Sequence, residues 1–265
     1  MKMFEAITDS ECCLCGSTSD LTGEHKIKAS ALRRIFGKDA MIIGHFDGER
    51  EPRLAQGPKS SEFHFGAKLC GTCNASGTQP ADRTFDQFHE EVARRFDAGL
   101  GADDLFPAER YSEGAAETLN IFRYFGKLLV CQVADTGGPR LTAVAQFAVG
   151  RSDFNPVKLK IRADATYQDF TQISDDFLGF AGHGGLVINH SCGGVLSGFH
   201  STLSLGPIQY VYWVEFRGDV SADLAEADPR FFAVTREAFR KSMKTPMTDH
   251  ERRKLGFEPT QGERP

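Results

Sequence analysis

Two pairs of cysteines have the spacing of a metal site. Cys12 and Cys15 form the first pair, and Cys70 and Cys73 form the second, within the stretch "LCGTCN". Each pair can present two thiolates from one tight turn, and four thiolates complete the tetrahedral coordination of zinc with no open position. We therefore predict a structural Zn²⁺ that joins the two ends of the intervening loop. Four unrelated buried thiols are the alternative.

Residues that suit a harder metal stand close to these pairs. Glu24 and His25 are neighbours in "LTGEHK", Asn74 follows Cys73 directly, and Asp82 comes later in the same stretch. Hydrolysis of a phosphodiester needs an activated water and neutralisation of the negative charge on the phosphoryl group. A neutral imidazole can take the proton of the water near pH 7, and carboxylates bind hard cations. A zinc ion with four thiolate ligands has no open position for the phosphate or the water, so we expect a second site with a catalytic Mg²⁺ or another divalent cation.

The order of these motifs, CxxC…LTGEH…CxxCN…D, resembles the zinc-containing branch of the HNH endonuclease family. The resemblance covers about residues 11–98 and implies a ββα-metal fold. By this resemblance His25 is the general base, Glu24 is the acidic metal ligand that precedes it, and Asn74 steadies the active loop. Asp82 takes the place of the last metal ligand.

Two features depart from the pattern of that family. The last metal ligand is often His in the family, whereas Asp82 is an acid, and Asp86 and His89 on the same helix face are alternatives to it. The family's "EHIIP" also reads "EHKIK" here. Lys26 and Lys28 are therefore either phosphate contacts or surface residues, and surface positions are the simpler interpretation.

The spacing of apolar residues predicts the elements that hold these side chains. Residues 37–62 are polar and rich in Gly and Pro, which is typical of a long loop between paired elements. A helix should begin near Pro80, because Phe and Val residues recur at helical spacing from Phe85 to Phe96. The stretch "DAGLGADDLFP" then ends this helix, and we place a domain boundary there.

The two halves of the chain are expected to form separate domains. Residues 1–105 form the HNH-like zinc and nuclease domain, and residues 110–265 form an α+β domain with an antiparallel sheet. The second half opens with an amphipathic helix in "AAETLNIFRYFGKLLVCQVA". Runs of β-branched and aromatic residues then predict strands in "VKLKIRA", "GLVINH", "GVLSGFHSTLSL" and "IQYVYWVEF". No motif here names a chemistry, so the role of this half is specificity, dimerisation or regulation.

A second group of His and Cys residues lacks the spacing of a metal site. His183, His190, Cys192 and His200 lie in the strand-rich part of the chain. Only His190 and Cys192 alternate on one face of a strand, so we favour ordinary core and turn positions for this group. Cys131, in apolar surroundings, is also expected in the core.

Composition and charge limit the partners and the location. The chain has 265 residues, of which 40% are hydrophobic and 25% are charged, as in ordinary globular proteins. It shows no apolar run long enough to span a membrane and no apolar segment typical of a signal peptide, so we expect a cytoplasmic location and no membrane partner. The net charge of −5 opposes overall attraction to nucleic acid. Contact must come from local patches, and the Lys and Arg residues between positions 236 and 254 form either such a patch or a solvated helix face and terminus.

Three functions fit these observations. The leading one is a metal-dependent HNH endonuclease that hydrolyses phosphodiester bonds in nucleic acid, with DNA favoured over RNA, and with a homodimer or a partner protein through residues 110–265 left open. The second is a catalytically inactive, zinc-stabilised nucleic-acid-binding or effector module. The presence of Glu24, His25, Asn74 and Asp82 together favours the enzyme, because a binding module needs none of them. In the third, residues 110–265 sense a ligand and the zinc domain responds.

Overall fold

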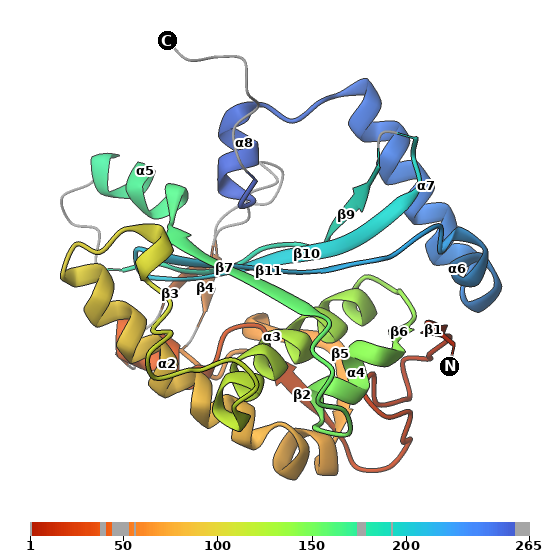
Figure 1. The fold of residues 1–265 in the computed structure, drawn as a ribbon, viewed down its shortest axis with the longest axis horizontal. Helices are drawn as coiled ribbons and strands as arrows, with labels where there is room; N and C mark the ends of the chain where they lie inside the picture. The colour runs from red at the N-terminus through yellow and green to blue at the C-terminus, as the bar shows by residue number, and fades with distance from the viewer. Residues whose placement is uncertain are drawn as a thin grey trace.

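A five-stranded antiparallel sheet divides the molecule into an upper and a lower layer (Figure 1). This computed structural model describes residues 2–37, 41–43, 53–55, 57–173, 179–191 and 193–257. It is 44% helical and 23% strand, and the pairs within its sheets are antiparallel. The predicted α+β class with an antiparallel sheet is therefore confirmed.

The large sheet is built from the second half of the chain. Its strands are β7 (Val157–Ala163), β8 (Ala181–His183), β9 (Val187–His190), β10 (Leu196–Leu205) and β11 (Ile208–Glu215). The order is β7, β11, β10, β8, and β9 pairs with the first part of β10. Four of these strands coincide with the four predicted runs. Tyr210 and Tyr212 stand two residues apart on β11, so both rings face the lower layer and contact Phe125.

The helix α3 (Ala116–Asp135) runs under this sheet through the centre of the molecule. The sequence predicts an amphipathic helix, but every residue from Tyr124 to Val133 is buried. The sheet covers one side, and α2 (Gln79–Asp97) and α4 (Thr142–Ala148) cover others. A helix enclosed in this way leaves no polar face, so a charged residue on it must find a partner inside the protein.

The lower layer also contains a small two-stranded sheet, whose second strand packs against α3. Its strands are β2 (Leu21–His25) and β5 (His64–Cys70), which pair antiparallel with Leu21 opposite Cys70. The helix α2 begins with Pro at its first turn, as predicted from Pro80, and buries its Phe side chains. Between the strands lie α1 (Ala29–Phe36) and the short pair β3 (Met41–Ile43) and β4 (Arg53–Ala55), with part of the predicted loop outside the described residues.

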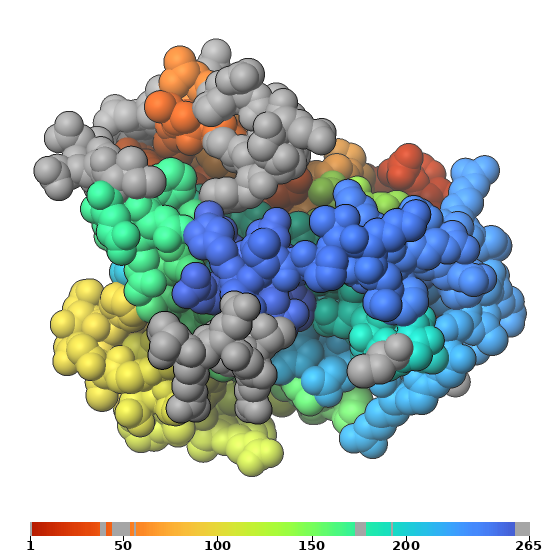
Figure 2. All heavy atoms as spheres, turned by 90° about the horizontal axis from the view of Figure 1, so that it is seen from above, coloured from red at the N-terminus to blue at the C-terminus, as the bar shows by residue number. Residues whose placement is uncertain are grey.

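The C-terminal helices cover the upper face of the sheet. The helices α5 (Ala165–Ile173), α7 (Pro229–Lys244) and α8 (Asp249–Lys254) lie above it in Figure 1, and Figure 2 shows α7 and α8 spread across this face. The Lys and Arg residues between 236 and 254 are thus separated from β2 and β5 by the sheet. Within the described ranges, no helix has the length and apolar character needed to cross a membrane.

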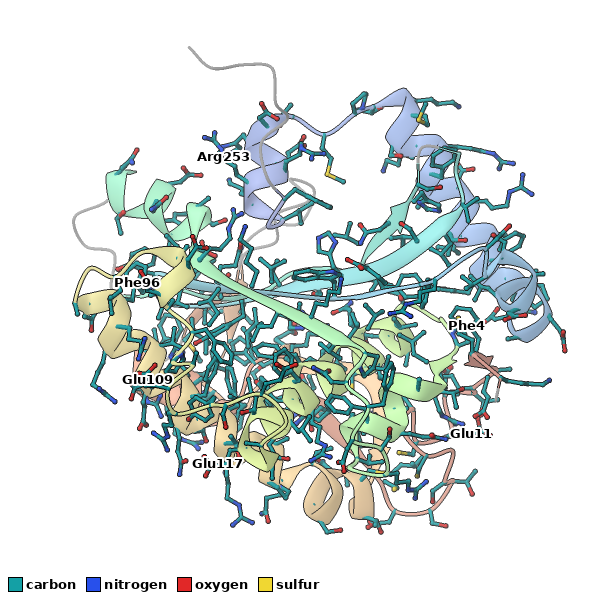
Figure 3. All side chains as sticks on the ribbon, in the orientation of Figure 1. Phe4, Glu11, Phe96, Glu109, Glu117 and Arg253 are labelled. Carbon is teal, nitrogen blue, oxygen red and sulfur yellow. The ribbon has the colours of Figure 1, made fainter. Side chains whose placement is uncertain are left out.

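Side chains from both halves of the chain share one hydrophobic core. The ring of Phe85 on α2 stacks on Tyr124 of α3 with centroids 3.9 Å apart, and it also contacts Tyr210 of the sheet. Figure 3 shows this concentration of side chains between the sheet and the lower helices. The strand pair β1 (Phe4–Glu5) and β6 (Arg140–Leu141) adds a second connection. The division at residues 97–112 into two domains stays a prediction, and extensive contacts cross it.

Candidate functional site

The four predicted cysteine ligands meet at one end of the β2–β5 pair. Cys70 ends β5, and the turn that holds Cys12 and Cys15 is fixed to β5 by a hydrogen bond from the Cys13 backbone N–H to the Lys68 carbonyl oxygen. All four sulfur atoms lie within 4.8 Å of one another. A tetrahedron with metal–sulfur bonds of about 2.3 Å has sulfur atoms about 3.8 Å apart. The cluster therefore has the dimensions needed to hold a metal ion.

The chemistry of the thiols also suits a cation. A hydrogen bond from the Cys73 thiol, and further ones from backbone N–H groups, hold the pKa of Cys12 well below its usual range. The hydrogen bond from the Cys73 thiol to Cys12, together with burial, raises the pKa of Cys73. A lowered pKa favours the thiolate form of Cys12, and a bound cation would stabilise that form.

The two predicted acidic metal ligands meet at the opposite end of the same strand pair. Glu24 lies near the end of β2 and is 7% exposed, and Asp82 lies in the first turn of α2. Lys127 of α3 stands between them, because its Nζ donates to Glu24 Oε1 and to Asp82 Oδ1, each at 2.7 Å. The two carboxylate oxygens are therefore no further apart than twice that distance. One oxygen of each carboxylate accepts from Lys127, and a pair of carboxylates suits a hard divalent cation.

The pairing of β2 with β5 is irregular at this point. Gly23 lies opposite Lys68, but His25 lies opposite His64, so β5 contains extra residues across from Glu24. Bulges of this kind change the direction of side chains and occur next to active sites. A side chain at position 23 would bring its Cβ to 3.3 Å from the His64 ring, so glycine keeps the space that this ring uses.

His25, the predicted general base, packs against a second histidine. The rings of His25 and His64 have centroids 3.8 Å apart, and His64 Nδ1 donates to the Ser60 carbonyl oxygen at 3.2 Å. Burial lowers the pKa of His25 to about 4, and electrostatic repulsion from the neighbouring His64 and Lys127 side chains acts in the same direction. His25 Nε2 is buried without a hydrogen-bond partner. The ring is thus neutral near pH 7, and the same lowered pKa makes it a weaker base than an exposed histidine.

Asn74, predicted to steady the active loop, connects the cysteine turn to β2. It lies in the one-turn π-helix η2 (Cys73–Gly77). Its Nδ2 donates to Thr22 Oγ1 at 2.9 Å and to the Gly23 carbonyl oxygen at 3.4 Å. These contacts hold the segment just before Glu24, so Asn74 acts on the site through the backbone of β2.

The two alternative metal ligands on α2 have other partners. Asp86 forms an ion pair with Lys28 at 2.7 Å, and Lys28 also donates to the Asp82 carbonyl oxygen. His89 is buried, and its Nδ1 lies 2.7 Å from the Tyr210 hydroxyl inside the aromatic core. Of the three candidates on α2, only Asp82 lies beside Glu24 through Lys127.

The two lysines that depart from the family pattern are held by carboxylates. Lys28 is mostly buried, with 16% of its side chain exposed, in its pair with Asp86. Lys26 pairs with Asp135, at the end of α3, at 3.2 Å and lies over the Phe65 ring. Both ammonium groups thus have partners within the protein, and neither is the free surface residue that the sequence suggested.

The second histidine group is spread over separate contacts. His183 Nε2 lies 2.9 Å from the Tyr212 hydroxyl, His200 Nδ1 lies 3.2 Å from Asn189 Oδ1, and the His190 ring packs on Phe239. Cys192 lies outside the described residues. In the part of the chain that the structure describes, the only cluster of His, Cys, Asp or Glu ligands close enough to hold a metal is that of the four cysteines.

Two further cysteines among the described residues are buried, and the burial of Cys131 was expected. Cys131 on α3 is fully buried, and its sulfur lies 3.7 Å from that of Cys13. Cys13 is the residue of the first cysteine turn that has no place in the cluster. Both are therefore core thiols packed behind the metal-binding end.

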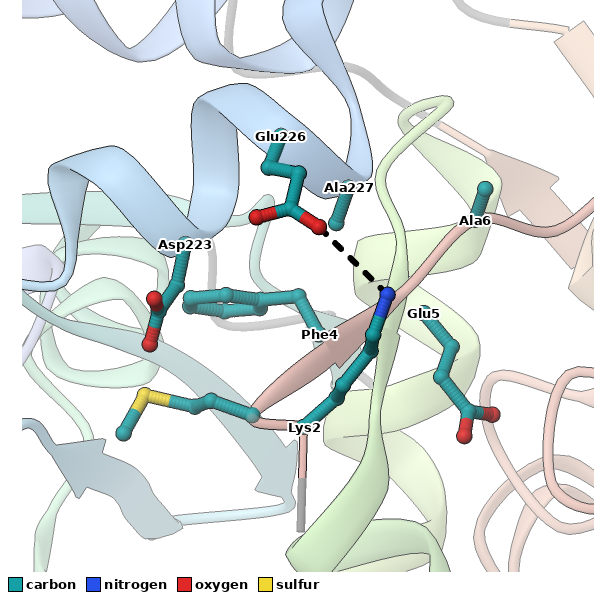
Figure 4. Close-up of a pocket in the computed structure, with 8 residues that line it drawn as sticks. Lys2, Phe4, Glu5, Ala6, Asp223, Glu226 and Ala227 are labelled. Atoms are coloured by element: carbon teal, nitrogen blue, oxygen red, sulfur yellow. Dashed lines mark hydrogen bonds and ion pairs between the residues drawn. The ribbon is translucent and has the colours of Figure 1, made fainter.

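A surface hollow of about 540 Å³ lies elsewhere, between β1 and α6 (Ser221–Ala227) (Figure 4). Its ion pair joins Lys2 and Glu226 at 3.5 Å, and their side chains are 76% and 77% exposed. Such exposed pairs contribute little free energy. The hollow is separate from the Glu24–Lys127–Asp82 cluster.

Two residues of this site were missed by the sequence analysis. Lys127 had a signal, because it is the one charged residue in the apolar run "YFGKLLV", and a buried Lys needs carboxylate partners. The sequence held no signal for His64, since its role depends on the register between β2 and β5.

Comparison of the chain with models of protein families, with curated proteins and with solved structures finds no match.

Proposed function

We propose that this chain is a zinc-stabilised, metal-dependent endonuclease of the HNH type, which hydrolyses phosphodiester bonds and acts preferentially on DNA. The observation that carries the proposal is the meeting of Glu24 and Asp82, which are remote in sequence, at the His25 end of the β2–β5 pair. The order of the motifs and the arrangement of two strands and α2 support membership of that family.

The cysteine cluster supports zinc as the structural metal. All four ligands are thiolates of the soft type that zinc accepts, and they leave no coordination position open. The ion would fix the cysteine end of β2 and β5, so that Glu24 and His25 at the other end are held in place. We assign zinc a structural role for this reason.

The residues at the other end support the chemistry. A divalent cation bound by Glu24 and Asp82 would neutralise charge on the phosphoryl group and on the leaving oxygen. His25 is neutral, has an unpartnered buried Nε2, and would take the proton of the attacking water. Asn74 would hold β2 in position through its contacts with Thr22 and Gly23.

A second candidate is a zinc-stabilised nucleic-acid-binding or effector module without catalysis. The observation that favours it is Lys127, whose ammonium group already lies between Glu24 and Asp82. In this case the acid–lysine–acid cluster is a structural ion-pair network, and no divalent cation binds there.

Cleavage assays separate the two candidates. The zinc-loaded full chain is incubated with supercoiled plasmid, linear DNA and RNA, each with Mg²⁺, with Mn²⁺ or with a chelator, and its zinc content is measured afterwards. The endonuclease should cut DNA only with added divalent cation. If a folded, zinc-loaded protein cuts none of the three substrates with either cation, the endonuclease proposal is wrong and the binding module is favoured.

A further inference from the structure

Lys127 is the most completely buried charge in the candidate site, and it comes from outside the ββα unit. Its side chain is 1% exposed, compared with 9% for Glu24 and 21% for Asp82. It lies on α3, whereas Glu24 lies on β2 and Asp82 on α2. The three residues thus join three separate elements at one nitrogen atom.

The arrangement balances charge inside the protein. A buried ammonium group is very unfavourable unless carboxylates compensate it, and two buried carboxylates repel each other unless a cation lies between them. Lys127 makes its two ion-pair contacts at 2.7 Å, and its ammonium also lies near the Tyr124 ring. The ammonium therefore occupies the position between the carboxylates that a divalent cation would also favour.

We infer that Lys127 is a positioning residue that brings Glu24 and Asp82 together and competes with a divalent cation for their carboxylates. The inference rests on the proposed function, which assigns a divalent cation to these two residues. With Lys127 in place the three charges sum to −1, and without it they sum to −2. The cation would thus bind less tightly to the wild-type site than to the two carboxylates alone. The ammonium group of Lys127 would, however, keep the two carboxylates together before the cation binds.

Lys127→Met tests the inference, because Met removes the charge and keeps most of the length and apolar surface. The probe is Mn²⁺, titrated by calorimetry into the zinc-loaded full chain at about pH 8, where the carboxylates are ionised. One unit charge at ion-pair distance contributes enough interaction to change affinity at least about tenfold. We expect Lys127→Met to bind Mn²⁺ about tenfold more tightly than the wild type. If Lys127 had only a structural role, its removal would lower the affinity for Mn²⁺ or leave that affinity unchanged.

Two matched variants control for the loss of an ion pair. Lys127→Arg keeps the positive charge between the carboxylates, so its affinity for Mn²⁺ should stay near that of the wild type. Lys26→Met breaks the pair with Asp135, which also joins the end of β2 to α3, and should leave the affinity unchanged. Added Mn²⁺ should also raise the melting temperature of Lys127→Met more than that of the wild type, because it replaces the missing cation.

Each outcome decides the inference. It is overturned if Lys127→Met binds Mn²⁺ no more tightly than the wild type, or if neither protein binds it. Should Lys127→Met fail to fold, the same comparison is made in the Glu24→Gln background, where only the more exposed Asp82 is left charged. If the protein cuts no nucleic acid but Lys127→Met binds Mn²⁺ more tightly, the proposed function fails and the inference stands. If the protein cuts DNA but the affinities are equal, the inference alone fails.

Discussion

The two ends of the β2–β5 pair gather remote residues in different ways. At the cysteine end, two local turns supply all four ligands, and their spacing along the chain already determines the site. At the carboxylate end, Glu24, Asp82 and Lys127 come from three elements, and the third lies on the central helix of the molecule. Thiols can be neutral and pack together before a metal binds, whereas the buried Glu24 carboxylate beside the partly exposed Asp82 needs a cation from the start. The carboxylate end therefore depends on more elements of the fold than the cysteine end does.

The strongest test of this difference is Cys70→Ala. Three thiolates do not complete the tetrahedron, and structural zinc sites contribute roughly 10–16 kcal/mol of apparent binding free energy, which is coupled to folding. We expect the variant to lose zinc and to fail to fold, as measured by metal analysis and thermal melting. Cys131→Ala is the control, since it removes a fully buried thiol that is not a ligand and should keep one zinc per chain. A Cys70→Ala protein with normal melting and full zinc would contradict the assignment.

A substitution at the carboxylate end should lower the rate of cleavage and leave folding intact. His25→Ala removes the proposed base but no zinc ligand, so the protein should fold, keep zinc and bind DNA. Loss of a positioned general base lowers rates by roughly 10²–10⁴-fold, and we expect that decrease in the rate of plasmid cleavage. His250→Ala, a half-exposed histidine on α8 above the sheet, should cut at the wild-type rate. Equal rates for His25→Ala and the wild type would show that another group acts as the base.

A third prediction concerns His89 in the middle of α2, the helix that carries Asp82 in its first turn. Burial lowers the pKa of His89 to about 4, and the charge of Arg34 adds to this effect. The unfolded chain, with an ordinary pKa near 6.5, then binds more protons than the folded chain between these values. The stability that neutral His89 contributes is present above about pH 6.5 and is lost as the pH falls towards 4.

The size of this loss is up to about 3 kcal/mol for one histidine, since each unit of pKa shift corresponds to about 1.4 kcal/mol. Urea unfolding at several pH values between about 7 and 5 measures it. The free energy of unfolding of His89→Gln should depend less steeply on pH than that of the wild type. Parallel curves for the two proteins would rule out this role of His89.

The smallest expected effect concerns the residue that joins the two ends. Asn74→Ala removes the hydrogen bonds to Thr22 and Gly23 but leaves all four cysteines in place. We expect a loss of about 1 kcal/mol in the free energy of unfolding, with zinc retained. Ser76→Ala is the matched control, because it removes one exposed hydrogen bond within the same turn and should cost less. A larger loss in Ser76→Ala than in Asn74→Ala would contradict the proposed connection.

The parts of the fold that depend on local patterns could be predicted. The helix α2 and four strands of the large sheet lie where spacing and β-branched residues place them, and the cysteine cluster follows from two local pairs. The surroundings of α3 could not be predicted, because periodicity shows which side of a helix is apolar but not how many elements enclose it. The same limit explains why Lys127 was recognised only in the structure. A lone lysine in an apolar run signals a buried ion pair, but its partners depend on long-range packing.

The position of Lys127 on α3 determines when the carboxylate end can be completed during synthesis. During synthesis the chain emerges from its N-terminus, so the segments that carry the cysteines, Glu24 and Asp82 leave the ribosome before α3 does. All four cysteine ligands have then been made, but Arg140, which follows α3, also holds the first cysteine turn through the Cys12 and Cys13 carbonyl oxygens. The carboxylate end is complete only after α3 has been made and has packed against α2, so a chain that ends before α3 would carry Glu24 and Asp82 without the ammonium group that joins them.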